Sequence, residues 1–369
     1  MSTIKDVARL AGVGVATASR ALSGNGPVSA DTLVRVRAAA AELDYRPSAI
    51  ARALSLQRSE AIGLFVPAFD SWFYAGIMTR IDAGLRAAGR HMVATGGSGP
   101  GDQRQQALDG IEFLLGRDCD GLIVASHHLR DADLQALCQR QPRLVVINRQ
   151  VPRMASHCFV TDHLEGGRLA ARALLSRGHR DIAVLSGPHD APDNEQRMAG
   201  FLDELAQHEL RPVLQFDGDF TYTSGAAIAG PLMAAIDRRL PAARRCSAIF
   251  CANDLMALGL SSCLTQAGWR LPDELSLLGY DDADIAPYAT PPLTTIHAPI
   301  AEAADAACQQ VLRLCDGTAR PAAQRRFDCA VIWRESVGPG PHAALGPAPR
   351  SATAPPLAVP QRRGSTTQY

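Results

Sequence analysis

The chain contains 369 residues, of which 47% are hydrophobic and 20% charged, and its 37 basic and 37 acidic residues give a formal net charge of zero. This length and composition predict a globular protein of two or more domains, and the zero net charge excludes binding of nucleic acid through overall charge. No apolar run approaches the roughly 20 residues that span a bilayer, and the first residues lack the apolar region of a signal peptide. Nine cysteines without a CxxC pair indicate a reducing compartment. We therefore expect a cytoplasmic protein with no membrane partner.

The N-terminal segment differs from the rest of the chain in its charge. Residues 1–58 contain eight basic and only four acidic side chains. A small basic segment attached to a neutral body is typical of a module that docks on phosphate groups.

Helical periodicity occurs three times within this segment. A first helix is predicted from apolar residues spaced on one face, with Thr3 and Asp6 forming a capping box at its start. Gly12 ends it with a tight turn, and a second helix is predicted over residues 15–22. Ser29 can cap a third helix, whose apolar face would consist of Leu33, Val36, Ala40 and Leu43. Three short helices around an Ala/Val/Leu core predict either a helix-turn-helix unit or a small structural bundle.

The order of the residues favours the helix-turn-helix. The run IKDVARLAGVGVATASRAL (residues 4–22), followed by YRPSAIARAL (residues 45–54), closely resembles the DNA-binding head of the LacI/GalR family of bacterial repressors. The resemblance implies that the second helix enters the major groove of DNA, where Arg20 reads a guanine and Val15 and Ala16 make apolar contacts. It also implies that the phosphates are bound by Thr17, Ser19, Asn25 and Ser29.

The resemblance continues into the linker that follows the head. The predicted helix over residues 48–55 is too short to be stable by itself. The resemblance implies that residues 47–60 form a hinge helix and linker, which fold on DNA beside the same segment of a second subunit. Leu54 would then wedge into a base step of the minor groove and kink the duplex. The DNA contacts implied for this part of the chain are Tyr45, Ser48, Ala51 and Leu54.

The body of the chain shows the pattern of an α/β protein. Short, continuous apolar runs recur every 25 to 35 residues, and helical segments such as 164–177 and 254–267 lie between them. This alternation predicts parallel βαβ units arranged as two doubly wound subdomains. The clearest predicted strands are residues 61–67, 91–96, 121–126, 144–148, 181–187, 248–253 and 275–281.

The amino-acid sequence of the body resembles that of the sensor domain of the same repressors. This domain shares its fold with periplasmic sugar-binding proteins. The runs GGRLAARALLSRGHRDIAVLSGP (residues 166–188), CANDLMALGL (residues 251–260) and LPDELSLLGYDDADIAPYATPPLTTI (residues 271–296) carry this resemblance. It implies an effector site of carboxylates, an amide, guanidinium groups and aromatic rings, which together suit a polyol. His163 replaces the asparagine usual in the family. The implied site residues are Phe73, Tyr74, Arg149, Asp193, Arg197, Phe220, Asn253 and Asp281.

The sequence lacks the residues that several classes of enzyme need for catalysis. Lys5 is the only lysine, so the body contains neither a phosphate-loop lysine nor a Schiff-base lysine. The run GGSGPGD at residues 96–102 misses the GxGxxG spacing, and His127 and His128 lack metal-ligand spacing. Asp281 and Asp282 are neighbours on a strand and should point apart. We expect a protein that is not an enzyme and has no cofactor or metal.

These observations predict a homodimeric repressor with four segments. Residues 1–46 form the helix-turn-helix head, 47–60 the hinge and linker, 61–337 the effector-binding and dimerisation domain, and 338–369 a Pro-rich disordered tail. The partners are a palindromic operator and a small-molecule effector, a sugar or sugar derivative. Two alternatives remain open. One is a regulator of the same fold gated by a nucleobase or a protein partner, and the other is a cytoplasmic sugar-binding protein without DNA function.

Overall fold

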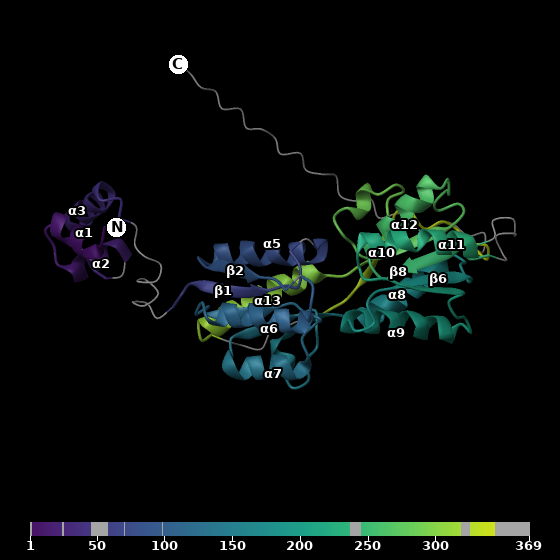
Figure 1. Cartoon of the computed structure of the whole chain (residues 1–369), viewed down its shortest axis with the longest axis horizontal. Coiled ribbons are helices and arrows are strands. Elements are labelled where there is room, and N and C mark those ends of the chain that lie inside the picture. Colours follow the sequence, from purple (N-terminus) through teal and green to yellow (C-terminus); the bar gives the residue numbers. More distant parts are fainter. Residues whose placement is uncertain are drawn as a thin grey trace, which may run out of the picture. The chain divides into compact units, whose positions relative to one another are not determined.

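The computed structural model describes residues 2–23, 26–45, 58–69, 71–97, 99–236, 245–318 and 325–343. The chain divides into two compact units: Met1–Phe159 together with Ala304–Ala323, and Val160–Ala303 together with Gln324–Tyr369. Figure 1 shows their helices and strands. The predicted hinge helix and the predicted DNA contacts Asn25, Ser48, Ala51 and Leu54 lie outside the described residues.

The first unit begins with three short helices, α1 (Ile4–Leu10), α2 (Val15–Ser23) and α3 (Ala30–Glu42). The Asp6 carboxylate accepts hydrogen bonds from the amide and hydroxyl of Thr3, at 3.0 and 2.7 Å. Gly12 turns the chain with a φ of 62°, and the Ser29 hydroxyl caps α3. The predicted head is confirmed, and its core consists of Val7, Ala8, Ala11, Ala18, Ala21, Val36, Ala39 and Ala40.

The rest of the first unit is built on a six-stranded sheet in the order β11-β5-β4-β3-β1-β2, in which all paired strands are parallel. The boundary between the two units falls within β5, and β11 belongs to the second unit. The strands are β1 (Ala61–Phe65), β2 (His91–Thr95), β3 (Gly121–Val124), β4 (Leu144–Ile147), β5 (Cys158–Thr161) and β11 (Arg326–Phe327). The accompanying helices are α5 (Trp72–Ala87), α6 (Gln103–Leu115), α7 (Asp131–Arg140), η1 (Ala155–His157) and α13 (Ile300–Cys315).

The second unit contains another six-stranded sheet, in the order β12-β10-β9-β8-β6-β7, with only the edge pair β10–β12 antiparallel. The strands are β6 (Ile182–Ser186), β7 (Leu214–Asp217), β8 (Ala248–Cys251), β9 (Ser276–Asp281), β10 (Thr294–His297) and β12 (Ala330–Ile332). The helices are α8 (His163–Ser176), α9 (Pro192–Gln207), α10 (Tyr222–Ala227), α11 (Ala229–Ala235), α12 (Asp254–Gln266) and η3 (Ala286–Tyr288).

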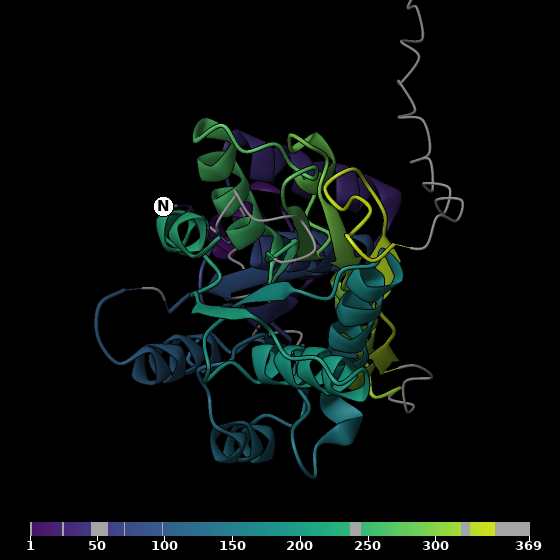
Figure 2. The same ribbon diagram turned by 90° about the vertical axis from the view of Figure 1, so that its right-hand side faces the viewer.

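Alternate side chains of these strands point to opposite faces of the second sheet. Ile182 and Val184 pack in a core with α8 and α9, whereas Ala183 and Leu185 pack in a core with α11 and α12. Helices therefore cover both faces of the sheet (Figure 1, Figure 2), and strands buried on both faces read as continuous apolar runs. The predicted architecture of two doubly wound sheets is confirmed.

Two features of the described chain were not expected from the sequence. Strands β5, β7, β10, β11 and β12 were not among the clearest predicted runs. Strand β7 lies at a sheet edge, where Gln215 and Asp217 alternate with apolar residues. The ordered chain also continues past the expected boundary at Val337. The amide of Gly340 donates to the Arg177 carbonyl at 2.7 Å, and that of His342 donates to the Gly178 carbonyl at 3.1 Å.

Helices α8 and α9 approach each other so closely that only glycine fits at the crossing. A Cβ atom on Gly167 would collide with the backbone carbonyl of Arg197, and one on Gly200 would collide with that of Leu164. These main-chain carbonyls cannot move aside as a flexible side chain can. The crossing therefore fixes α9, the helix that carries Asp193 and Arg197.

We predict that Gly200→Ala lowers the free energy of unfolding of the second unit by about 1–3 kcal/mol, because the added methyl group overpacks the crossing. Urea unfolding followed by the fluorescence of Trp269, which is buried in this unit, measures the change. Gly230→Ala in α11 is the matched control, because nothing lies within 4 Å of its added Cβ. That variant should be stabilised by up to ~1 kcal/mol through helix propensity. Equal effects of the two substitutions would contradict the role of the crossing.

Candidate functional site

One face of α2 carries the predicted DNA-reading residues. Val15, Ala16, Ser19 and Arg20 are exposed, whereas Ala18 is buried in the head. This helix presents apolar groups and a guanidinium together on one open surface, which suits entry into a major groove.

The other predicted DNA-contact residues that lie within the described chain differ in their environment. The Thr17 hydroxyl accepts a hydrogen bond from Arg20 at 3.4 Å, which restrains that guanidinium. Ser29 is exposed, but its hydroxyl oxygen also caps α3. Tyr45 is half-buried against the head core.

In the second unit, a buried guanidinium forms the centre of a polar cluster. The side chain of Arg197 is only 2% exposed. Its Cζ atom lies 3.8 Å from the ring centroid of Tyr280 and 5.5 Å from that of Phe220. Its Nη1 donates to the carbonyl of Ala252, the residue that follows β8. A cation held between two aromatic faces is stabilised by their quadrupoles.

Two carboxylates balance this charge at distances longer than a hydrogen bond. Asp193 Oδ2 and Asp281 Oδ1 lie 3.5 and 3.7 Å from Arg197 Nη2. Arg197 Nε and Asp281 Oδ1 are buried and have no hydrogen-bond partner among the described residues. Buried polar groups in native proteins are normally hydrogen-bonded, so this donor and this acceptor are available to a ligand.

The backbone geometry at the end of β9 directs its two aspartates to different partners. Asp281 has a φ of 107° and Asp282 a φ of 59°, and both values are unusual for residues other than glycine. Asp281 faces Arg197, while Asp282 accepts from Arg334 at 2.7 Å and pairs with His297 at 3.1 Å. The two carboxylates do not form a catalytic pair.

Phe220 and Asn253 complete the group of predicted residues in this unit. Phe220 has a φ of 67°, and its ring lies over Gly187, where a Cβ atom would not fit. Asn253 Nδ2 donates to the Phe220 carbonyl at 2.9 Å, and Asn253 Oδ1 caps α12 by accepting from Met256 at 2.9 Å. Asn253 thus holds Phe220 beside Arg197, and five of the eight predicted effector residues lie in one cluster.

The other three predicted effector residues lie in the first unit, at the carboxyl end of its sheet. Tyr74 lies 3.4 Å from His127 in the loop after β3, and Phe73 meets Tyr74 edge to face. Arg149 donates to the carbonyl of Leu129 in the same loop and to Asp131 at 2.7 Å. These contacts give Arg149 a structural role in holding the loop to which Tyr74 is bonded.

The sequence interpretation assigned no role to Tyr280 or to His163. Tyr280 is fully buried and lies 2.9 Å from His163 Nδ1. Burial, reinforced by Arg197, lowers the pKa of His163 to about 3, so its imidazole is neutral. The neutral Nδ1, also 3.4 Å from Arg197 Nη2, can accept a hydrogen bond from the Tyr280 hydroxyl. The replacement of the family's asparagine by His163 was the sequence feature that could have pointed to this contact.

Asp254 was also missed, and it shapes the loop that carries Asp281. Its carboxyl group accepts from the Thr295 hydroxyl at 2.6 Å and from the Ala283 amide at 2.8 Å. Burial, together with the nearby Asp281, raises the pKa of Asp254 well above its usual value. The residue therefore has a structural role. Its place directly after the cap residue Asn253 gave no sequence signal for this contact.

A pocket of about 290 Å³ lies between α9 and the paired strands β6 and β7. None of the eight predicted effector residues lines it, and its walls include Ser186, Asn194, Met198, Phe216 and Asp217. Asn194 is hydrogen-bonded to the backbone of Gly187 and Pro188.

In the described ranges, no helix combines the length and apolar character needed to cross a bilayer. Within the same ranges, no three His, Cys, Asp or Glu side chains lie close enough together to hold a metal ion.

Asp281 and Asp282 should titrate with opposite consequences for stability. Burial raises the pKa of Asp281 to about 7 despite the attraction of Arg197. Its contribution to stability is therefore present at low pH and lost as the pH rises between about 4 and 7. Burial also opposes ionisation of Asp282, but hydrogen bonds from His297 and Arg334 hold its pKa below the usual value. Its contribution is lost as the pH falls.

We predict that Asp281→Asn removes a downward slope in the free energy of unfolding across this pH range, whereas Asp282→Asn, the matched control, does not. Carboxyl ¹³C shifts followed by NMR should show a midpoint near pH 7 for Asp281 and a midpoint below the usual value for Asp282. A midpoint near pH 4 for Asp281 would contradict the buried environment assigned to it.

The fold and these surfaces define a class: a DNA-binding protein that carries a ligand-binding body of the periplasmic-binding-protein type. Residues 3–48 match the model for bacterial regulatory proteins of the lacI family, and residues 171–337 match a periplasmic binding protein-like domain. The chain is 34% identical over 337 residues to the HTH-type transcriptional regulator GalR of Escherichia coli K12, which covers 91% of this chain and 96% of GalR. The chain belongs to the lacI family.

Solved structures show the same relationship. The Lac repressor dimer bound to operator and the anti-inducer ONPF has a TM-score of 0.79 and 26% identity, and the match covers 91% of this chain and 99% of that one. The complex of the transcriptional regulator CelR with cellobiose has a TM-score of 0.63 and 29% identity, and it covers 91% and 100%. The resemblance found in the sequence is thereby confirmed, and the protein is a DNA-binding transcriptional regulator.

Proposed function

We propose that this regulator represses carbohydrate-utilisation genes and that a sugar or sugar derivative gates its binding to a palindromic operator. The observation that carries the proposal is the buried pair of Arg197 Nε and Asp281 Oδ1, a donor and an acceptor without hydrogen-bond partners in the described chain. A hydroxyl group both donates and accepts, so neighbouring hydroxyls on one ligand satisfy both atoms.

The charges of the cluster favour a neutral ligand over an anion. The Arg197 guanidinium is already balanced by Asp193 and Asp281, while His163 is neutral. The Phe220 ring beside Arg197 offers an apolar face on which a sugar ring can stack. The related CelR was solved with cellobiose, a neutral sugar. The proposed effector contacts are Phe73, Tyr74, Arg149, Asp193, Arg197, Phe220, Asn253 and Asp281.

The DNA contacts are proposed on the exposed face of α2 and in the hinge. Arg20 reads a guanine, Val15 and Ala16 contact thymine methyl groups, and the phosphates are bound by Thr17, Ser19, Asn25 and Ser29. Tyr45, Ser48, Ala51 and Leu54 are the proposed contacts beyond the head. A head of this size binds a single half-site weakly, so two copies related by two-fold symmetry bind a palindrome. The similar Lac repressor was solved as a dimer bound to operator.

Gating by the effector requires little energy. A hundredfold change in operator occupancy corresponds to ~2.7 kcal/mol of difference in effector affinity between the DNA-bound and free forms. A ligand that binds one conformation of the regulator more tightly than another would favour one arrangement of the subunits and so alter the spacing of the two heads.

We predict that Asp281→Ala retains operator binding but loses the response to sugar. Wild-type protein is first screened by thermal shift against neutral sugars, sugar acids, phosphorylated sugars and purines. Each compound that raises the melting temperature is then tested for its effect on operator binding. Asp217→Ala, an exposed carboxylate of the same unit, should respond like wild type. A normal response of Asp281→Ala would refute the proposed effector site. If only purines raise the melting temperature, the proposal that the effector is a sugar is wrong.

We predict that Arg20→Ala relaxes discrimination at one base pair of each half-site and costs about 1–3 kcal/mol per half-site. Binding of duplexes that vary one position at a time measures the change. Arg37→Ala removes the same charge from an exposed position of α3 and should leave base discrimination intact. If both variants keep the wild-type preference, Arg20 does not read a base.

A further inference from the structure

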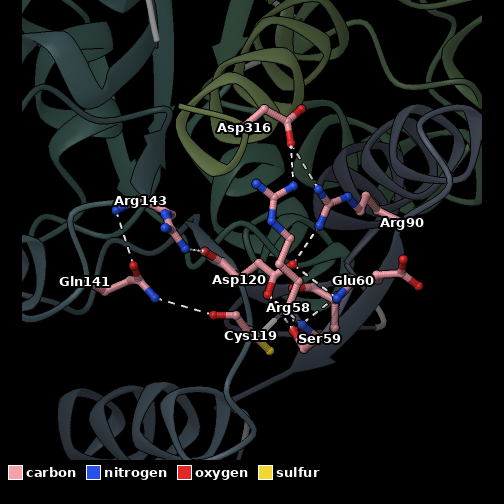
Figure 3. A network of polar contacts seen from close by, with 10 residues as sticks. Arg58, Ser59, Glu60, Arg90, Cys119, Asp120, Gln141, Arg143 and Asp316 are labelled. Atoms are coloured by element: carbon pink, nitrogen blue, oxygen red, sulfur yellow. Dashed lines mark hydrogen bonds and ion pairs between the residues drawn. The ribbon is translucent and has the colours of Figure 1, made fainter. Parts of the chain in front are cut away.

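The amino ends of three strands in the first unit meet at one buried carboxylate, shown in Figure 3. Asp120 precedes β3, and its side chain is 8% exposed. Its Oδ1 accepts from the amide and hydroxyl of Ser59, at 2.7 and 3.0 Å. Its Oδ2 accepts from the Glu60 amide at 3.1 Å and from Arg90 Nη1 at 2.6 Å. Four donors therefore satisfy this carboxylate.

Two further ion pairs extend this network to the surface. Arg90, which precedes β2, is 10% exposed and also donates to Asp316 Oδ1 at 3.1 Å. Arg58 reaches the same oxygen of Asp316 at 3.4 Å. Asp316 directly follows α13. We refer to the charged residues Arg58, Arg90, Asp120 and Asp316 as the clasp.

The clasp lies where the linker enters the body. Residues 46–57 are outside the described chain, which resumes at Arg58. Ser59 and Glu60, the next two residues, are both bonded to Asp120, and the Glu60 carbonyl accepts from the His91 amide at 2.9 Å. Glu60 has a φ of 57°, a conformation that a residue other than glycine keeps only when its surroundings hold it. The path of the chain is thus fixed at its first body residues.

The clasp also lies at the opposite edge of the sheet from the ligand-facing loops. The parallel strand β1 runs from the clasp to its carboxyl end, the edge at which Tyr74 and the loop after β3 are found. Asp316 ends α13, a helix whose first residues, 300–303, belong to the second unit. Strand β1 therefore connects the clasp to the end of the sheet at which we propose effector contacts, and α13 connects it to the second unit.

We propose that the clasp is a positioning device for operator binding: it fixes the start of the linker, so that the hinge is ordered on DNA at a lower entropic cost. The inference rests on the DNA-binding function proposed above. Ordering residues on a partner costs conformational entropy, and anchoring one end in advance reduces that cost. Without the clasp, the same head binds the same DNA more weakly.

The test uses the full chain and a duplex that the wild-type protein selects from a random library. Asp316→Asn and Arg58→Gln remove the outer ion pair, whose members are half-exposed, so the fold should persist. We expect each variant to bind the duplex roughly fivefold or more weakly with an unchanged melting temperature. The control is Glu112→Gln, which breaks the similarly exposed pair with Arg140 in the same unit and should bind like wild type.

A flexible Gly-Ser insertion between residues 57 and 58 separates positioning from a general structural effect. In that background the linker is already uncoupled, so adding Asp316→Asn should cause no further loss of affinity, as a double-mutant cycle requires. Wild-type affinity of both clasp variants, or a loss that persists unchanged after the insertion, would overturn the proposal. If the wild-type chain selects no duplex, the proposed DNA-binding function fails instead.

Discussion

The second unit depends on one constraint: a guanidinium removed from water must be stabilised by the protein around it. Arg197 is fully buried, and an unpaired charge in such a place is very costly. Burial disfavours its charge, and the nearby carboxylates, led by Asp281, outweigh that effect and raise the pKa of Arg197. The ring of Tyr280, the carbonyl of Ala252 and the neutral His163 complete its surroundings. These partners still leave one donor and one acceptor without a hydrogen bond, and we propose that a ligand supplies it.

The geometry around Arg197 is set by neighbouring elements that hold its helix and its partners in place. The glycine crossing of α8 and α9 fixes the helix that carries Arg197. The cap residue Asn253 holds the backbone of Phe220, and Asp254 holds the loop that follows Asp281. Left-handed backbone conformations at Phe220 and Asp281 show that the chain accepts local strain to direct these side chains. Such strain is typical of binding sites supported by a rigid scaffold.

The two ends of the first sheet serve different purposes. At the carboxyl end, Tyr74 and Arg149 both contact the loop that follows β3. Open α/β sheets bind ligands at this end of their strands. At the amino end, a buried carboxylate and a buried guanidinium hold the chain that arrives from the head. Because β1 joins the two ends, the proposed ligand contacts and the linker entry share one rigid element. In the function proposed for this regulator, the shared element would link the ligand contacts to the linker.

The sequence by itself determined the head, the alternation of strands and helices and the family, because these follow from short-range periodicity, caps and local motifs. The helices α2 and α3 and the strand β6 lie close to their expected positions, since apolar spacing dictates which face is buried. Only the tertiary structure decided which polar groups meet. His163 and Tyr280 are 117 residues apart, and Arg58 and Asp316 are 258 apart. The ionisation of Asp281 and His163 depends on burial by distant segments, which no local pattern encodes.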